Sequence, residues 1–299
     1  MAALLQTEVS AVAHLSAKQC TAFERDGYLV LPDAVDAAQL SKLRGQLDAW
    51  VEESRAHDAP YGETIDKLPR FDIAAEHSSD APALRRINNP AEVSDIYAEV
   101  AFDSAMVDAV AEVIGPDVKF HHGKINVKLP GTTTKVDYHQ DFSYTPHTND
   151  DIVTALLMLD DVTVENGCLT VVPGSHREGQ KSLWQGNRFT GKVDAETEQD
   201  ALRRAVPVTG PAGSVCLMHT ALLHGSAANR SAQRRTLYIC VYTAADAWPL
   251  ARSPLPNRFE GRIVRGSARP TARLMSGEVE LPEDFRAASF FEIQERASS

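Results

Sequence analysis

The chain has 299 residues, 43% of them apolar and 24% charged, which is the composition of a soluble globular protein large enough to bury a core. Its formal net charge of -11 disfavours nucleic acid and anionic membranes as partners, because both attract clustered lysine and arginine. The four cysteines are too widely spaced for a zinc motif, and no apolar stretch is long enough to cross a membrane. We therefore expect a cytoplasmic protein, monomeric or homodimeric, whose partner is a small molecule.

The first third of the chain is predicted to be mostly helical. A capping-box pattern that begins at Ser16 predicts a short helix, and a strand over 28–31 should follow it. Apolar residues at three-and-four spacing predict a long amphipathic helix over 36–55, and a further helix is expected over 103–114. Between them, mixed charge and weak periodicity over 56–90 indicate a loop with short helical pieces.

Beyond Pro116 the sequence changes to short β-rich runs separated by turn residues. The runs are VKFHH, KINVKL, VDYHQDF, IVTALLML, CLTVV, SVCLMH and RTLYICVYT. We predict a mainly β protein, a cupin-like double-sheet jelly roll over about 116–245, with the helices of about 16–115 packed outside it. Residues 246–299 would form a C-terminal extension, and the whole chain, 1–299, a single domain.

Two candidate metal ligands, His139 and Asp141, lie in the run from Val136 to Phe142. Side chains two apart on a strand project from the same face, so this imidazole and this carboxylate can converge. They are two of the three ligands in the facial triad of non-haem Fe(II) oxygenases. A His-x-Asp pair alone also fits an exposed polar strand end, so a second, distant histidine is needed to complete the site.

The segment HGSAANRSAQRR supplies that histidine, His224, and an arginine eleven residues later, Arg235. A guanidinium can bind the distal carboxylate of 2-oxoglutarate through two parallel charge-assisted hydrogen bonds. Strand alternation places Arg235 on the apolar face of the strand that follows, which should point inward, and Arg234 on the opposite face. We therefore predict Arg235 as the buried cosubstrate anchor and Arg234 as a surface or salt-bridge residue.

With these motifs the sequence resembles the phytanoyl-CoA dioxygenase family of iron- and 2-oxoglutarate-dependent oxygenases, from about residue 16 to 245. The resemblance is carried by FERDGYLVLPDAV, YHQDF, ENGCLTVVPGSH and HGSAANRSAQRR. It implies a double-stranded β-helix as the fold, and Fe(II), 2-oxoglutarate and dioxygen as the reactants that the protein brings together.

The resemblance also implies roles for individual residues. The Fe(II) ligands would be His139, Asp141 and His224. Arg235, together with Ser226, would bind the far carboxylate of 2-oxoglutarate. Asn126, thirteen residues before His139 on the preceding strand, would lie near the same cosubstrate.

The expected reaction is the hydroxylation of a small metabolite, or its desaturation or cyclisation, with release of succinate and carbon dioxide. Halogenation is disfavoured, because related halogenases carry a small residue in place of the acid at Asp141.

Phe142, Tyr144 and Trp184 are candidate substrate contacts, with core packing as the equal alternative. The competing function is a non-catalytic, cupin-like metal-binding module, which would have no use for Arg235. A nucleic-acid or protein demethylase shares the iron chemistry but is disfavoured by the acidic charge.

We do not expect three further histidines to bind the metal. Strand alternation predicts that His121 and His122 point to opposite faces, and both are expected to be structural. His147 is expected to be a solvated loop residue, with a position at the cavity mouth as the alternative.

Overall fold

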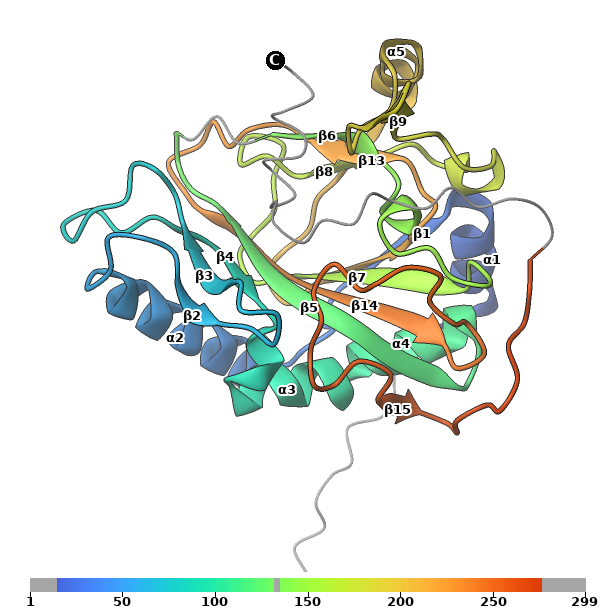
Figure 1. The fold of residues 1–299 in the computed structure, drawn as a ribbon, viewed down its shortest axis with the longest axis horizontal. Coiled ribbons are helices and arrows are strands. Elements are labelled where there is room, and N and C mark those ends of the chain that lie inside the picture. The colour runs from blue at the N-terminus through green and yellow to red at the C-terminus, as the bar shows by residue number, and fades with distance from the viewer. Residues whose placement is uncertain (1–14, 132–134, 276–299) are drawn as a thin grey trace, which may run out of the picture.

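A computed structural model describes residues 15–131 and 135–275 of the chain. Two β-sheets face each other, and helices lie along the outer face of the larger sheet (Figure 1). The paired strands of the described residues are antiparallel, and their order alternates between distant parts of the sequence. The predicted jelly roll with flanking helices is confirmed.

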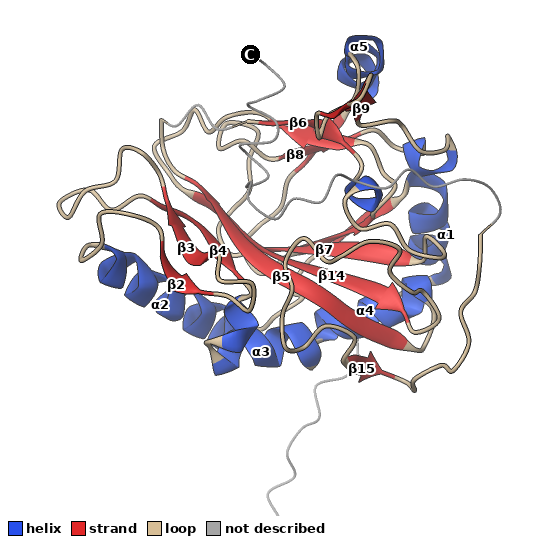
Figure 2. Ribbon diagram, viewed as in Figure 1, coloured by secondary structure: helices blue, strands red, loops and turns tan. Residues whose placement is uncertain are grey.

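Figure 2 shows the smaller sheet above the larger one. The larger sheet has the order β1 (Tyr28–Leu31), β12 (Val215–His219), β7 (Ile152–Met158), β14 (Arg235–Ala244), β5 (Val118–Lys128), β4 (Leu84–Asn88), β3 (Pro69–Ile73), β2 (Tyr61–Glu63), and β15 (Ile263–Arg265) pairs with β5. The smaller sheet has the order β11 (Val206–Val208), β8 (Leu169–Val171), β13 (His224–Ser226), β6 (Val136–His139). A separate hairpin joins β9 (Trp184–Gln185) and β10 (Arg188–Phe189).

The helices are arranged mostly on one side of the larger sheet (Figure 1). They are α1 (Ala17–Asp26), α2 (Ala37–Ser54), α3 (Asp95–Phe102), α4 (Ala105–Ile114) and α5 (Ala195–Arg204), with short 3-10 turns η1 (Pro90–Glu92), η2 (Asp141–Ser143) and η3 (Ser175–Arg177). The predicted capping box at the start of α1 is confirmed, because the Ser16 hydroxyl accepts a hydrogen bond from the Gln19 amide. Across residues 15–131 and 135–275, no helix combines the length and hydropathy of a membrane span.

The two largest clusters of buried hydrophobic residues lie between the layers of secondary structure. The outer core lies between the larger sheet and the helices, where the hydroxyls of Tyr238 and Tyr242 on β14 donate to the carbonyls of Tyr97 and Ala101 on α3. The inner core lies between the two sheets and contains alternate residues of β7, β12 and β14. Its buried members include Leu156, Met158, Val171, Met218, Leu237 and Ile239. Side chains on the inner faces of the sheets therefore point toward each other.

One expectation for the N-terminal third is wrong, and another is confirmed but incomplete. The segment 56–90 is not a loop with helical pieces, because it forms β2, β3 and β4, which extend the larger sheet beyond β5. The helix expected over 103–114 is confirmed as α4, and the sequence did not predict the separate helix α3 that ends at Phe102 before it. The pattern of residues 56–90 does not indicate strands, because cationic and apolar residues are both buried there, on opposite faces.

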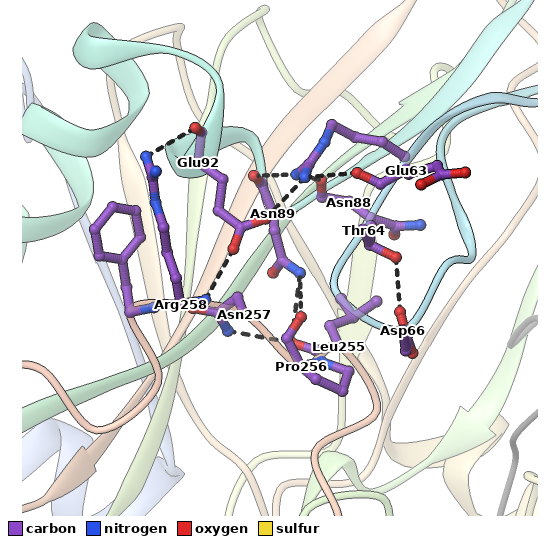
Figure 3. A network of polar contacts seen from close by, with 12 residues as sticks. Glu63, Thr64, Asp66, Asn88, Asn89, Glu92, Leu255, Pro256, Asn257 and Arg258 are labelled. Atoms are coloured by element: carbon purple, nitrogen blue, oxygen red, sulfur yellow. Dashed lines mark hydrogen bonds and ion pairs between the residues drawn. The ribbon is translucent and has the colours of Figure 1, made fainter.

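The described part of the C-terminal extension packs back onto the larger sheet. Figure 3 shows the contact, in which the Asn89 side chain donates to the Pro256 carbonyl over 3.1 Å and the Glu92 carboxylate accepts from the Arg258 amide over 2.8 Å. The Asn257 side chain donates to the His121 carbonyl of β5 over 2.9 Å. The bonds of Asn89 and Glu92 connect the segment after β4 with residues more than 160 positions later in the chain.

Candidate active site

The three candidate ligands converge at the edge of the smaller sheet. His139 ends β6 and His224 begins β13, and the two are direct partners in the antiparallel register. Their ring centroids lie 4.3 Å apart. Asp141 starts η2, and its Oδ1 lies 3.4 Å from Nε2 of His139 and 3.7 Å from Nε2 of His224.

The local backbone differs from the predicted strand. β6 ends at His139, and Asp141 belongs to a 3-10 turn, so the expectation of a strand through Phe142 is wrong. Gln140 still has extended dihedrals, with φ -116 and ψ 128, so its neighbours project to one side as strand alternation requires. The Gln140 side chain points away from them and donates to the Ala221 carbonyl over 2.6 Å.

Backbone carbonyls hold the two imidazole rings. Nδ1 of His139 lies 2.8 Å from the Asp137 carbonyl, and Nδ1 of His224 lies 2.9 Å from the Leu222 carbonyl. A carbonyl accepts only from a protonated nitrogen, so in the neutral ring the lone pair is on Nε2, which faces Asp141. Burial, followed by the neighbouring His139, lowers the pKa of His224 to about 4, so this ring is neutral at pH 7.

The Asp141 carboxylate is held by a hydrogen bond and is ionised. Oδ2 of Asp141 accepts a hydrogen bond from the hydroxyl of Thr154 on β7 over 2.7 Å, which leaves Oδ1 toward the histidines. Burial raises the pKa of Asp141, but the adjacent His224 and His139 outweigh it and hold this pKa well below its usual range. No signal in the sequence identifies Thr154, because threonine is an ordinary strand residue.

These residues fit a divalent transition metal. One ligand atom from each of the three side chains lies within 4.8 Å of the others, and no further such group of His, Cys, Asp or Glu occurs in the described residues. Two imidazole nitrogens and one carboxylate oxygen on one side of an ion leave the other positions open for further ligands. This is the donor set of a catalytic rather than a closed structural site.

Arg235 lies buried at the start of β14, on the inner face of the larger sheet. Its Nη2 donates to the Gly167 carbonyl over 3.0 Å, whereas its buried Nε has no hydrogen-bond partner in the described residues. Gly167 has φ +78, and a Cβ there would lie 2.6 Å from the Ala227 carbonyl oxygen. Burial lowers the pKa of Arg235 to about 10, so the guanidinium remains protonated at pH 7.

A second basic residue, Lys128, lies beside Arg235 and was missed from the sequence. It is the cross-strand partner of Arg235, and its Nζ donates to the Ser226 hydroxyl over 2.8 Å and to the Ala227 carbonyl. Burial, and then Arg235, lower the pKa of Lys128 to about 6. A signal existed, because Lys128 stands two residues after Asn126 on a predicted strand and so shares its face.

Ser226 and Asn126 lie in the same region. Ser226 stands two residues after His224 on β13, which places their side chains on one face about 7 Å apart along the strand. Asn126 is the register partner of Leu237, a residue of the inner core, and its buried Oδ1 has no hydrogen-bond partner in the described residues. With Nε of Arg235, this atom marks a polar site that a ligand can complete.

The two adjacent arginines point to opposite sides of the sheet. Arg234 forms an ion pair with Asp48 of α2 over 2.8 Å, whereas Arg235 is buried. Strand parity thus separates them as expected, but the premise that only one face of β14 is buried is wrong. Tyr238 packs in the outer core and Ile239 in the inner core, so both faces of β14 are covered.

The three candidate substrate contacts occupy different surroundings. Phe142 is fully buried in a small apolar cluster with Ile152 and Val241, which favours core packing. Tyr144 packs edge-on against His139 with centroids 5.7 Å apart, and its hydroxyl donates to the Gly191 carbonyl over 2.7 Å. Trp184 lies on the β9–β10 hairpin and is only partly buried.

The other histidines differ from expectation. His121 and His122 do not point to opposite faces, because a bulge in the β5–β14 register brings their Nδ1 atoms within 2.6 Å of each other. His147 is not solvated: it is buried and lies with its ring centroid 5.1 Å from that of His121. Burial lowers the pKa of His147 to about 4 and that of His121 to about 3, so both rings are neutral at pH 7.

Known proteins are similar to this chain in sequence and in fold. A protein of Stutzerimonas stutzeri named "Probable alpha-ketoglutarate-dependent hypophosphite dioxygenase" is 34% identical over 71% of this chain and 74% of its own. L-proline trans-4-hydroxylase of Streptomyces griseoviridis is 26% identical over 76% of this chain and 86% of its own. The crystal structure of EctD from S. alaskensis with 2-oxoglutarate and 5-hydroxyectoine is 25% identical, covers 89% of this chain and 87% of its own, and gives a TM-score of 0.62.

A family model described as Phytanoyl-CoA dioxygenase (PhyH) matches residues 23–237, which include all three candidate ligands and Arg235. The chain therefore belongs to the phytanoyl-CoA dioxygenase family of iron- and 2-oxoglutarate-dependent dioxygenases.

Proposed function

We propose that this dioxygenase holds Fe(II) with His139, Asp141 and His224 and hydroxylates a small molecule. The observation that carries the proposal is the convergence of two imidazoles and one carboxylate, each held by its own hydrogen bond. Bound iron and 2-oxoglutarate supply the activation of dioxygen, with succinate and carbon dioxide as products. The protein contributes orientation of the ligands and a site from which bulk water is largely excluded.

We infer that 2-oxoglutarate lies between the metal ligands and the Arg235–Lys128 pair. The guanidinium of Arg235 would donate to the far carboxylate, with the Ser226 hydroxyl and the Lys128 ammonium as further donors. Asn126, on the same face, would contact the cosubstrate nearer the metal. The spacing of His224 and Ser226 along β13 supports this placement, because about 7 Å suits a five-carbon diacid.

The substrate is expected to be small and polar. The relatives at 34% and 26% identity are named for hypophosphite and L-proline, and EctD holds 5-hydroxyectoine. Among the predicted contacts, Tyr144 and Trp184 remain candidates because they lie beside the metal site and on a nearby hairpin. We expect the enzyme to act in the cytoplasm, as a monomer or homodimer, with the jelly roll and the C-terminal extension forming a single domain.

The test is an assay of succinate formation from 2-oxoglutarate in the presence of Fe(II) and air. We expect slow formation without substrate and faster formation when a compound from a metabolite screen fits. Asp141→Ala should abolish both rates, because it removes one ligand of the triad, while the fold is retained. Zinc-loaded protein is the control, since it binds the site without redox chemistry. Metal binding with no succinate from any mixture would favour the non-catalytic binding module instead.

A further inference from the structure

His122 lies in the same cross-strand row as a residue that holds the carboxylate of the candidate metal site. His122 of β5 is the register partner of Val241 of β14, and Val241 is the partner of Thr154 of β7. Cross-strand partners project from the same face of a sheet, so these three side chains point the same way. The Thr154 hydroxyl donates to Asp141 over 2.7 Å. His122 therefore shares the face of the metal site, two strand spacings from Thr154, which is about 10 Å between backbones.

The ring of His122 contacts the ring of the residue before it. Nδ1 of His122 lies 2.6 Å from Nδ1 of His121. Two ring nitrogens this close hold one proton between them, because two N–H groups would clash and two lone pairs would repel each other. Burial, and then His147, lower the pKa of His121 to about 3, and burial, and then His121, hold the pKa of His122 well below its usual range. Both rings are therefore neutral at pH 7, and only one of them carries its proton on Nδ1.

The surroundings of His121 decide which ring that is. Nε2 of His121 lies 3.8 Å from Oε1 of Glu260. Burial raises the pKa of Glu260, whereas the charge of Arg252 favours its ionised form. A carboxylate attracts an N–H and repels a lone pair, so His121 carries its proton on Nε2 and turns the lone pair of Nδ1 to His122. His122 then donates from Nδ1, and the lone pair on its Nε2 has no hydrogen-bond partner in the described residues.

The C-terminal extension holds the two rings in place. The Asn257 side chain donates to the His121 carbonyl over 2.9 Å, and Figure 3 shows Asn257 in this segment. Glu260 follows three residues later. The Phe120 amide, next to His121 in the chain, donates to the Arg262 carbonyl over 2.9 Å. The acceptor on His122 is therefore positioned before any ligand binds, by a segment outside the jelly roll.

We propose that Nε2 of His122 accepts a hydrogen bond from the substrate, which therefore carries a hydroxyl or an ammonium group. This inference rests on the proposed function, because it assigns a substrate contact of the same metal site. A compound without an N–H or O–H group leaves the buried lone pair of His122 unpaired and is rejected for that reason. His121 is a positioning residue, which fixes the tautomer of His122 and does not touch the substrate.

The tautomer is tested by nitrogen-15 NMR of zinc-loaded protein with 2-oxoglutarate, which is diamagnetic. Two other histidines supply reference signals in the same spectrum. Nδ1 of His147 donates to a backbone carbonyl over 2.8 Å, whereas Nδ1 of His77 accepts from a backbone amide over 2.8 Å. We expect His122 to match His147, with the proton on Nδ1, and His121 to match His77, with the proton on Nε2. A proton on Nε2 of His122 overturns the inference.

Substrate choice is tested by succinate formation in protein loaded with Fe(II) and 2-oxoglutarate, in air. The probes are pairs that differ in the donor, such as glycine and L-proline against their fully N-methylated betaines, and alcohols against their methyl ethers. We expect the wild type to prefer the donor compound of a pair at least about tenfold in kcat/KM. The preference should nearly vanish in His122→Leu, persist in part in His122→Gln, whose amide oxygen can accept, and be unchanged in the control His77→Gln.

The affinity for 2-oxoglutarate is measured in the same variants and separates the possible failures. We expect His122→Leu to bind 2-oxoglutarate like the wild type, which also shows that the variant is folded. If it loses 2-oxoglutarate, His122 belongs to the cosubstrate site and the inference is overturned. A preference that survives undiminished in His122→Leu reflects the size of the methyl groups and overturns the inference as well. A wild type that forms no succinate with any compound contradicts the proposed function rather than this inference.

Discussion

Each of the two histidines beside Asp141 uses Nδ1 for orientation and turns Nε2 toward the carboxylate. The bonds to the carbonyls of Asp137 and Leu222 fix the tautomer of the neutral ring, with the lone pair on Nε2. Lys128 is different, because its pKa of about 6 makes it largely an uncharged amine at pH 7 before a ligand binds. A carboxylate placed beside it favours the ammonium form and raises this pKa.

Binding of 2-oxoglutarate should therefore depend on pH through Lys128. Below pH 6 the ammonium is already present, and above pH 6 the amine must take up a proton when the carboxylate binds. We predict that affinity falls as pH rises from 6 to 8, by up to about tenfold per pH unit. The measurement is the dissociation constant at pH 6, 7 and 8 with saturating Fe(II). Lys128→Met should weaken binding at pH 6 and flatten the profile; an equally steep profile in this variant would assign the proton to another group.

At the scale of single elements, the turn before β8 holds the side chain of Arg235, the proposed anchor of 2-oxoglutarate. The Gly167 carbonyl accepts from Arg235, and the backbone of this residue lies against Ala227 with positive φ. Gly179 has nearly the same dihedral, φ +80, but a Cβ there would meet nothing within 4 Å. Alanine substitutions at these two glycines therefore separate the free-energy cost of a left-handed backbone from the cost of the close contact with Ala227.

We predict that Gly179→Ala lowers the free energy of unfolding by about 1 kcal/mol, the cost of positive φ alone. Gly167→Ala should cost more, because its Cβ would overlap the Ala227 carbonyl, and it should also weaken 2-oxoglutarate binding by moving the acceptor of Arg235. Urea unfolding and a 2-oxoglutarate titration of both variants check this. Equal losses of stability in the two variants would show that the close approach relaxes without cost.

For the whole molecule, the sequence predicted the jelly roll and the segments whose candidate ligands converge, because alternating β-rich runs and the spaced His, Asp and Arg motifs are local signals. It did not predict β2–β4, since a strand such as β4 that buries Arg86 and Ile87 on opposite faces lacks the usual alternation of polar and apolar residues. Thr154 and the bulge at His121 depend on register between distant strands, which no local pattern encodes.

The central claim is that the His139–Asp141–His224 site and the Arg235–Lys128 pair together hold a chelated keto acid. Its most direct test is anaerobic titration of the metal-free protein, first with Fe(II) and then with 2-oxoglutarate. We predict a weak visible metal-to-ligand charge-transfer band that saturates with 2-oxoglutarate, is absent in Asp141→Ala, and needs much more 2-oxoglutarate in Arg235→Ala. Iron binding to the wild type without this band, at any concentration of 2-oxoglutarate, would contradict the claim.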